Sequence, residues 1–234
     1  MPTAASSSAL PAGFSATRES LRALACYAIS PWCKARSGRI GLRSLADGWG
    51  TPVLDDGSRV VVRGDRLALV PGPEVSISTV RAAAELLGVE PSSDPGVGSD
   101  LPPYAPDAPL GVDRAASEAL AAWYAAGQVV IDRVQEARAV QPVVVAQLWP
   151  EHFDLAVALP SASSAANVGV SPGDGFCDEP YVYVGPHRLD GLAGPYWNAP
   201  FGSYASRSEL LGRGELVGAG VDFVLEGLQL LDQA

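Results

Sequence analysis

One of the chain's two histidines, His152, stands in the stretch WPEHFD, between Glu151 and Asp154. An apolar run follows and predicts a strand, on which alternate side chains share a face, so we expect His152 and Asp154 to point from the same face. A carboxylate two residues away could hold the imidazole in one tautomer or raise its pKa, as a general base or metal ligand requires. The equal alternative is that both side chains satisfy backbone groups where the strand leaves the turn set by Pro150.

A second polar cluster lies in VSPGDGFCDEPYVYVGPH, residues 170–187. Asp174 and Glu179 are candidates for a second carboxylate beside the histidine. A strand over YVYV would place Tyr183 and Tyr181 on one face. Tyrosines that line a pocket and tyrosines that cover a core fit this pattern equally.

A third candidate segment is YWNAPFGSY, residues 196–204, which contains Trp197 and Asn198. Glycine and proline punctuate it, so the loop is expected to be rigid, aromatic and polar. Such a loop suits the wall of a ligand pocket. It equally suits ordinary loop packing.

Gly169, Ser171 and Gly173 match the GxSxG pattern of a hydrolase nucleophile elbow. We reject that interpretation because the elbow needs a strand, a tight turn and then a helix. Here Pro172 follows the serine at once, and the next apolar run is another strand. The segment is therefore predicted to be a turn.

Metal and cofactor motifs are weak. His152 and His187 could bind a transition metal with a carboxylate if they converge, which the sequence leaves open. The acidic residues lack the spacing of a calcium loop. GRGELVGAG, residues 212–220, resembles a phosphate loop, but no apolar strand precedes it, so it predicts a helix entrance. We expect no metal and no organic cofactor.

Arginines alternate with apolar residues in the first half of the chain. If two predicted strands pair, Arg39, Arg43, Arg59 and Arg63 share one sheet face and could bind an anion. The favoured alternative is a solvated face, or one that is paired with the acidic second half of the chain.

The chain has 234 residues, 47% of them hydrophobic, which predicts a compact globular protein. Its start has no basic and apolar segments typical of a signal peptide, and no stretch approaches a membrane span, so we expect a cytoplasmic protein with no membrane partner. Residues 91–234 carry 6 basic and 18 acidic groups, against 10 and 8 in residues 1–90. That acidic half would repel a phosphate backbone, so nucleic acid is not an expected partner.

Three cysteines, Cys26, Cys33 and Cys177, cannot all pair within the chain and lack zinc-type spacing. Reduced thiols are expected. Asp178 and Glu179 would oppose a thiolate at Cys177, so we expect that residue to be inert.

Four segments are predicted, the first being a disordered N-terminus over residues 1–13. In residues 14–90, a helix begins with Ser15 as N-cap and stops at Pro31. Strands follow over GRIGLRSL, TPVL, RVVVRG and RLALV, with turns at DGWGTP and DDGS, and then a helix that ends at Gly88. Residues 91–110 contain six prolines and predict an extended connector.

The second half, residues 111–234, repeats this order. Asp113 is predicted to cap a long helix with Leu120, Trp123, Val130 and Val134 on its apolar face. Strands are expected over PVVVAQLW, FDLAVAL, ANVGV and EPYVYVG, before a C-terminal helix. Consecutive strands joined by turns favour antiparallel meanders. We therefore predict an α+β fold of two related helix–strands–helix halves, with a mostly antiparallel sheet flanked by helices and the halves packed as one globular unit.

With these motifs laid out, the chain resembles a family of uncharacterised, mostly actinobacterial proteins that is known only as a domain of unknown function. The resemblance rests on QLWPEHFDLAVAL, on VSPGDGFCDEPYVYVGP and on YWNAPFGSYASRSEL, and in order it covers most of the chain. Some relatives lack the histidine found here as His152. The resemblance implies an organisation and supplies no substrate or reaction.

The function favoured by these residues is the binding of a small molecule in a pocket of the second half. Its predicted lining is Trp149, His152, Asp154, Asp174, Glu179, Tyr183, Trp197 and Asn198. If the pocket is catalytic, His152 is the expected general base, Asp154 its orienter and Glu179 a second carboxylate, in a hydrolysis or isomerisation. The alternative is a non-catalytic interaction or oligomerisation module, and a homo-oligomer is left open.

Overall fold

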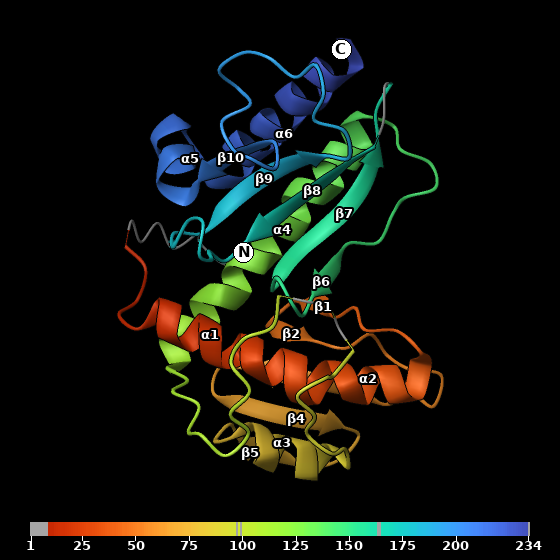
Figure 1. Ribbon diagram of the computed structural model, residues 1–234, viewed down its shortest axis with the longest axis vertical. Coiled ribbons are helices and arrows are strands. Elements are labelled where there is room, and N and C mark those ends of the chain that lie inside the picture. Colours follow the sequence, from red (N-terminus) through yellow and green to blue (C-terminus); the bar gives the residue numbers. More distant parts are fainter. Residues whose placement is uncertain (1–8, 97, 99, 163–164, 234) are drawn as a thin grey trace.

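A computed structural model of the chain describes residues 9–96, 98, 100–162 and 165–233 (Figure 1). Most of the predicted disordered N-terminus, residues 1–8, lies outside this range. Residues 9–13 lead through a turn, in which Phe14 N donates to Pro11 O at 3.2 Å, into the first helix.

The first helical run continues past the predicted stop. Helix α1 (Phe14–Leu24) passes through a π-helical stretch, η1 (Ala25–Ile29), into α2 (Ser30–Ser37). Pro31 lies in the first turn of α2, where its missing N–H is tolerated, and the wider π turn before it gives room for its ring. The predicted N-cap was wrong too: Gly13 is the N-cap, and Ser15 Oγ donates to an Asp178 carboxylate oxygen at 2.9 Å.

The first sheet is an antiparallel meander in the order β1-β2-β3-β4-β5. Its strands are β1 (Arg43–Leu45), β2 (Gly48–Gly50), β3 (Arg59–Arg63), β4 (Arg66–Val70) and β5 (Glu74–Ser76). The GWG segment, predicted as a turn, is β2, because buried Trp49 pairs with Val62 of β3 and anchors it. The predicted TPVL strand is a loop, and the DDGS turn was correct, with Gly57 at φ 80°.

Three of the four predicted arginines share a face of this sheet. Pairing of Arg43 with Gly50, Gly50 with Val61 and Arg59 with Val70 gives Arg43, Arg59 and Arg63 the same face. Arg39 lies before β1. Arg63 pairs with Asp47, and the neighbouring Arg66 pairs with Glu74; both acidic partners belong to the first half of the chain, so these ion pairs are not made with the acidic second half.

Helix α3 (Val80–Leu87) ends at Gly88, at φ 65°, as predicted, and its N-cap is Thr79, whose Oγ1 accepts from Ala82 N. Between it and α4 (Arg114–Ala137), the described part of the connector has neither helix nor strand and lies along the first helical run. Lys34 Nζ donates to Gly96 O at 2.8 Å, for example. Asp113 caps α4 as predicted.

The second sheet is also an antiparallel meander, in the order β10-β9-β8-β7-β6. Its strands are β6 (Gln147–Trp149), β7 (Asp154–Pro160), β8 (Ala165–Ser171), β9 (Tyr181–Pro186) and β10 (Ser203–Ser206). The strand predicted over PVVVAQLW is shorter, because residues 143–145 form an exposed extended segment before β6. Strand β10 and helix α5 (Arg207–Arg213) were not predicted, whereas the C-terminal helix is α6 (Leu216–Gln233).

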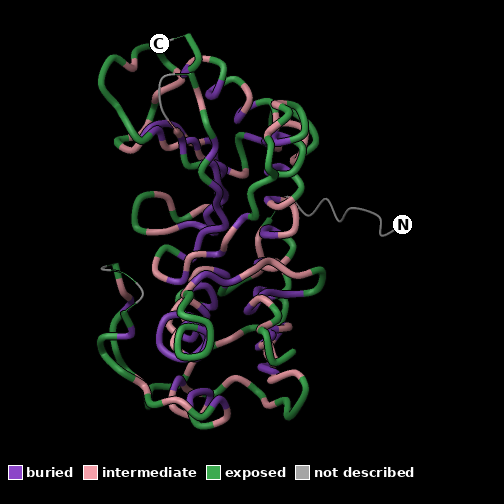
Figure 2. The backbone as a smooth tube through the Cα atoms, turned by 90° about the vertical axis from the view of Figure 1, so that its right-hand side faces the viewer, coloured by how far each residue is buried: buried purple, intermediate pink, exposed green. Residues whose placement is uncertain are grey.

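One backbone bridge joins the two sheets. Leu42 N donates to Leu148 O at 2.8 Å, and Leu148 N donates to Leu42 O at 3.0 Å. Helix α4 contacts β1, β2 and β3 on one side of this junction and β7 and β8 on the other. Buried backbone accordingly runs through the middle of the molecule in Figure 2, with exposed loops at both ends.

The architecture is thus the predicted α+β fold, with helices flanking antiparallel sheets. Helices α4 and α6 cover the face of the second sheet that carries Leu155, Val170 and Val182, and they lie behind it in Figure 1. The opposite face, which carries Asp154, Ala156 and Tyr183, has no helix on it among the described residues; we call it the open face. No described helix combines the length and apolar character that a membrane crossing needs.

Candidate functional site

A pocket of about 450 Å³ lies on the open face of the second sheet. Strands β6 to β9, the turn between β6 and β7, and the extended segment before β6 all contribute to it. It is lined by Val144, Val145, Gln147, Trp149, Glu151, His152, Asp154, Ala156, Val157, Ala158, Asn167 and Tyr183. Four of the predicted site residues, Trp149, His152, Asp154 and Tyr183, therefore line one pocket.

Asp154 is the buried charge of this pocket. It begins β7, and its side chain is on the open face but only 8% of the residue is exposed. One carboxylate oxygen, Oδ2, accepts a hydrogen bond from Tyr183 Oη, whereas the other, Oδ1, is buried and has no partner. Burial raises the pKa of Asp154 to about 6, and the nearby Glu151 adds to the rise, whereas the Tyr183 hydrogen bond and His152 oppose it.

Gly169, which has no side chain, lies on the strand between Asp154 and Tyr183 and leaves room for the Tyr183 hydroxyl to reach Asp154. A Cβ at Gly169 would be 2.8 Å from Tyr183 Oη and 2.9 Å from Ala156 Cβ. Burial, together with the Asp154 charge, raises the pKa of the Tyr183 phenol well above its usual value. Tyr183 therefore stays protonated and donates to Asp154.

Glu151 brings a second carboxylate to the pocket from the turn before β7. Its Oε2 is buried and has no hydrogen-bond partner, and burial raises the pKa of Glu151. The Arg22 side chain holds the turn in place, because its Nε donates to the backbone oxygen of Glu151 at 2.7 Å. Two unpartnered carboxylate oxygens therefore belong to one pocket.

His152 does not have the predicted strand geometry. The strand begins only at Asp154, and Phe153 has φ 55°, so His152 lies in a turn and is not in phase with Asp154 along a strand. The buried Phe153 ring packs against Trp49 and Tyr124, which explains why the backbone takes this conformation. The imidazole is 61% exposed, and its Nδ1 lies 3.7 Å from Asp100 Oδ2.

Asp154 therefore holds Tyr183, and the predicted role of Asp154 as the orienter of His152 is wrong in this geometry. His152 contributes to the pocket wall and to its charge.

Trp149 and the extended segment form the apolar wall. Trp149 pairs with Asp154 in the register of β6 and β7, which places its half-buried side chain on the open face. Val144 and Val145 continue the wall, with exposed fractions of 38% and 63%. Val144 is fixed by Gln135, whose side chain accepts from Val144 N at 2.7 Å and donates to Val144 O at 3.0 Å.

Asp174 and Glu179 are not part of the pocket lining. Asp174 closes the turn after β8, where its Oδ1 accepts from Phe176 N at 2.8 Å and its Oδ2 from Tyr181 Oη at 2.6 Å. Glu179 binds the start of α5, accepting from Ser208 N at 2.7 Å and from Ser208 Oγ at 2.8 Å. Both carboxylates therefore serve local structure, and their predicted placement in the pocket was wrong.

Trp197 and Asn198 also lie outside the pocket lining. Trp197 packs edge-on against Tyr196, which stacks on Phe223 of α6 at a centroid distance of 5.0 Å. Asn198 closes its own loop, with Oδ1 accepting from Tyr204 N at 3.0 Å and Nδ2 donating to Tyr204 O at 3.0 Å. The loop-packing alternative describes this segment.

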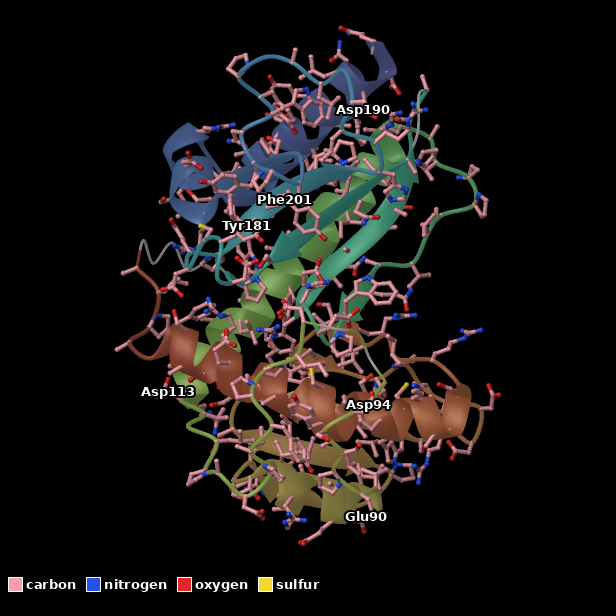
Figure 3. The ribbon with its side chains drawn as sticks, viewed as in Figure 1. Glu90, Asp94, Asp113, Tyr181, Asp190 and Phe201 are labelled. Carbon is pink, nitrogen blue, oxygen red and sulfur yellow. The ribbon has the colours of Figure 1, made fainter. Side chains whose placement is uncertain are left out.

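Aromatic side chains extend the open face beyond Tyr183. Tyr181 and Phe201, labelled in Figure 3, lie over the second sheet with ring centroids 6.4 Å apart, and Tyr183 contacts both. Phe176 and Tyr204 complete this group. A molecule larger than the pocket would meet these rings next.

The lining residues that were not predicted are Val144, Val145, Gln147, Glu151, Ala156, Val157, Ala158 and Asn167. Ala156 and Ala158 alternate with Leu155 and Leu159 in β7, so their small size on one face was a usable signal. Asn167, an exposed polar residue inside a strand, was another. The sequence Val-Val-Val gives no indication that residues 143–145 are exposed beside a pocket.

Other chemical groups are occupied by structural contacts. Ser171 Oγ accepts from Gly173 N at 3.1 Å, and a loop to β9 follows, which is not the geometry of a nucleophile elbow. Burial raises the pKa of Cys177 and raises that of Cys26 to about 12. In the described part of the chain, no three His, Cys, Asp or Glu side chains are grouped as metal ligands. His187 instead shares a 2.9 Å hydrogen bond with Asn167.

No protein-family model matches the chain, and comparisons with curated proteins and with solved structures also find no match. The resemblance to an uncharacterised actinobacterial family therefore stays a prediction, and the site must be interpreted from its own geometry.

Proposed function

We propose that this protein binds a small organic molecule in the open-face pocket, against Asp154, Glu151, Tyr183 and Trp149. The observation that carries the proposal is the unpartnered Oδ1 of buried Asp154. A buried polar atom without a hydrogen bond costs roughly 1–3 kcal/mol, and buried polar groups usually have partners. A ligand that donates to this oxygen would remove that cost.

The size and composition of the pocket support the same proposal. Ligand pockets commonly have volumes of roughly 300–1,000 Å³ and combine apolar walls with a few polar groups. Here a volume of about 450 Å³ is lined by valines, alanines, a tryptophan and a tyrosine around two carboxylates. These features suit a ligand with an apolar body and a polar head.

If the bound molecule is also transformed, Asp154 is the candidate proton-transfer group in place of His152. Its pKa of about 6 is close enough to neutral pH for a general base that is ionised when substrate arrives. Tyr183 would hold the carboxylate in position through Oδ2 and leave Oδ1 for the substrate. Glu151 would be the second carboxylate.

A second candidate function is the interaction module, in which the exposed valines contact another protein. Val143 is 61% exposed, and Val145, which lines the pocket, is 63% exposed. A protein partner could cover them. A test of whether small molecules bind to the purified protein distinguishes the two functions.

The test is a thermal-shift screen of the purified full chain against small amines, carboxylic acids, sugars, nucleosides and aromatic compounds. An Ala158→Trp variant places an indole in the pocket from an exposed strand position, and Ala122→Trp makes the same change at an exposed position of α4. We expect compounds that stabilise the wild type and Ala122→Trp but not Ala158→Trp. A screen in which no class of compound shows that pattern would overturn the proposal.

A further inference from the structure

We propose that the ligand of the open-face pocket is an organic cation, an amine or guanidinium compound whose charged head donates hydrogen bonds to Asp154 Oδ1 and Glu151 Oε2. The inference rests on the proposed function and names its ligand class. Asp154 is more than nine-tenths buried, lines the pocket and has an unpartnered oxygen, so the site is more than a cluster of surface carboxylates.

The first argument is hydrogen-bond chemistry. Ionised carboxylates accept hydrogen bonds and donate none. Both unpartnered oxygens of the pocket are carboxylate oxygens, and the one phenol that could supply a donor, Tyr183 Oη, is already bound to Asp154 Oδ2. The ligand must therefore bring donors, and ammonium and guanidinium groups bring the most.

The second argument is charge balance. None of the described lining residues is a lysine or an arginine. The guanidinium that acts on Glu151, that of Arg22, is committed to backbone and connector groups: its Nε donates to Glu151 O at 2.7 Å, and its Nη2 donates to Asp100 O at 2.6 Å. Among the described lining residues, only His152 can carry a positive charge, and it does so only when it is protonated. The two carboxylates therefore have no permanent cation in the pocket, and a positively charged ligand completes the site.

The third argument is the surroundings of the carboxylates. The rings of Trp149 and Tyr183 belong to the same pocket and attract a cation through their faces. Val144, Val145, Ala156 and Ala158 supply an apolar wall for a carbon skeleton. The wider field favours the same charge, since residues 91–234 carry 18 acidic and 6 basic groups.

Ligand charge can be determined from the pH dependence of binding. The titratable groups around Asp154 are Glu151 and His152 from the turn, Tyr183 and Tyr181 from β9, and Tyr124 from α4 behind the sheet. A cation prefers ionised Asp154, so its affinity should fall as pH drops through about 6. Protonation of Glu151 or His152 would act in the same direction. A ligand that accepts a hydrogen bond from protonated Asp154 would show the opposite trend.

The experiment compares probes that differ only in their head group. Hexylamine, hexanol and hexanoate, and likewise 2-phenylethylamine, 2-phenylethanol and phenylacetate, are titrated into the full chain while protein NMR shifts are followed at pH 7.5 and 5.0. We expect the amines to bind at least about tenfold more tightly than their alcohols at pH 7.5. Their affinity should fall about tenfold at pH 5.0, because one unit below a pKa about a tenth of the carboxyl is ionised.

Variants assign the effect to the two carboxylates. Asp154→Asn and Glu151→Gln keep the side-chain shape, and each should lower amine affinity at pH 7.5 by tenfold or more, and Asp154→Asn should flatten the pH dependence. Asp190→Asn removes an equal charge from an exposed loop residue (Figure 3) and should change nothing. Two carboxylate variants keep the test decisive if one of them folds poorly.

The outcomes separate this inference from the proposed function. If alcohols or acids bind as tightly as amines and Ala158→Trp abolishes that binding, the pocket stands and the cation inference is overturned. If amines bind but neither Asp154→Asn nor Glu151→Gln weakens them, the inference is also overturned. If none of the six probes binds, the cation inference falls, and the broader screen with Ala158→Trp judges the pocket itself.

Discussion

Replacing Asp154 by Asn should stabilise the protein at neutral pH. The side chain is 8% exposed, and its pKa is raised from an ordinary value of 3.8 to about 6. Each pKa unit corresponds to about 1.4 kcal/mol, so ionised Asp154 lowers the free energy of unfolding by about 3 kcal/mol at pH 7.5. Asparagine keeps the shape and an oxygen for Tyr183 and removes the charge.

The sign of the pH dependence follows from the direction of the shift. Because the folded-state pKa is raised, the native protein prefers the protonated carboxyl, and stability is lost as pH rises between 3.8 and about 6. The advantage of Asp154→Asn over the wild type should therefore shrink from about 3 kcal/mol at pH 7.5 to about 1 kcal/mol at pH 4.5.

Urea unfolding of both proteins at pH 7.5 and pH 4.5 measures this difference directly. Asp190→Asn is the matched control, since the same change at an exposed loop residue should alter stability by less than about 0.5 kcal/mol. The reasoning would be refuted if Asp154→Asn were less stable than the wild type at pH 7.5. A stability difference that stays constant between the two pH values would refute it as well.

Three further substitutions test the architecture around the pocket. Gly169→Ala should lower the free energy of unfolding, measured in urea, by about 1–3 kcal/mol, because the new Cβ would be 2.7 Å from Leu155 O. The same Cβ would displace Tyr183, so binding of any pocket ligand should weaken. Unchanged binding would contradict the Tyr183 geometry. Leu42→Ala removes a fully buried side chain at the junction of the sheets and should cost about 2–5 kcal/mol by the same assay, and a loss below about 1 kcal/mol would argue against that packing. Ser206→Ala breaks the capping box of α5 and should cost about 1 kcal/mol, with no effect expected on ligand affinity.

The fold was predictable where local signals act alone. The Gly88 cap of α3, the Asp113 cap of α4 and the alternation in β7 all depend on neighbours within a few residues. Predictions failed where distant contacts decide. Trp49 makes a strand of a glycine-rich segment because Val62 pairs with it, and the π turn lets the helical run continue into Pro31.

The candidate site divides in the same way. Trp149, Asp154 and Tyr183 line one pocket because strand register and alternation give their side chains the same face of the sheet. Asp174 and Glu179 were misplaced because a carboxylate that binds a turn and one that lines a pocket look alike in sequence. Phe153 has a positive φ and packs against Trp49, so His152 lies in a turn and does not follow the alternation of the strand. No local sequence pattern predicts that positive φ.

The bridge between Leu42 and Leu148 has a consequence for how the chain assembles. Each meander is built from hairpins whose partners are close in sequence, whereas this bridge closes a loop of more than a hundred residues and forms against a larger entropy of closure. We therefore expect the two halves to fold separately and to pack against each other late, with α4 spanning the junction between the sheets. A chain cut within the connector should then reassemble from its two fragments through the contacts at that junction.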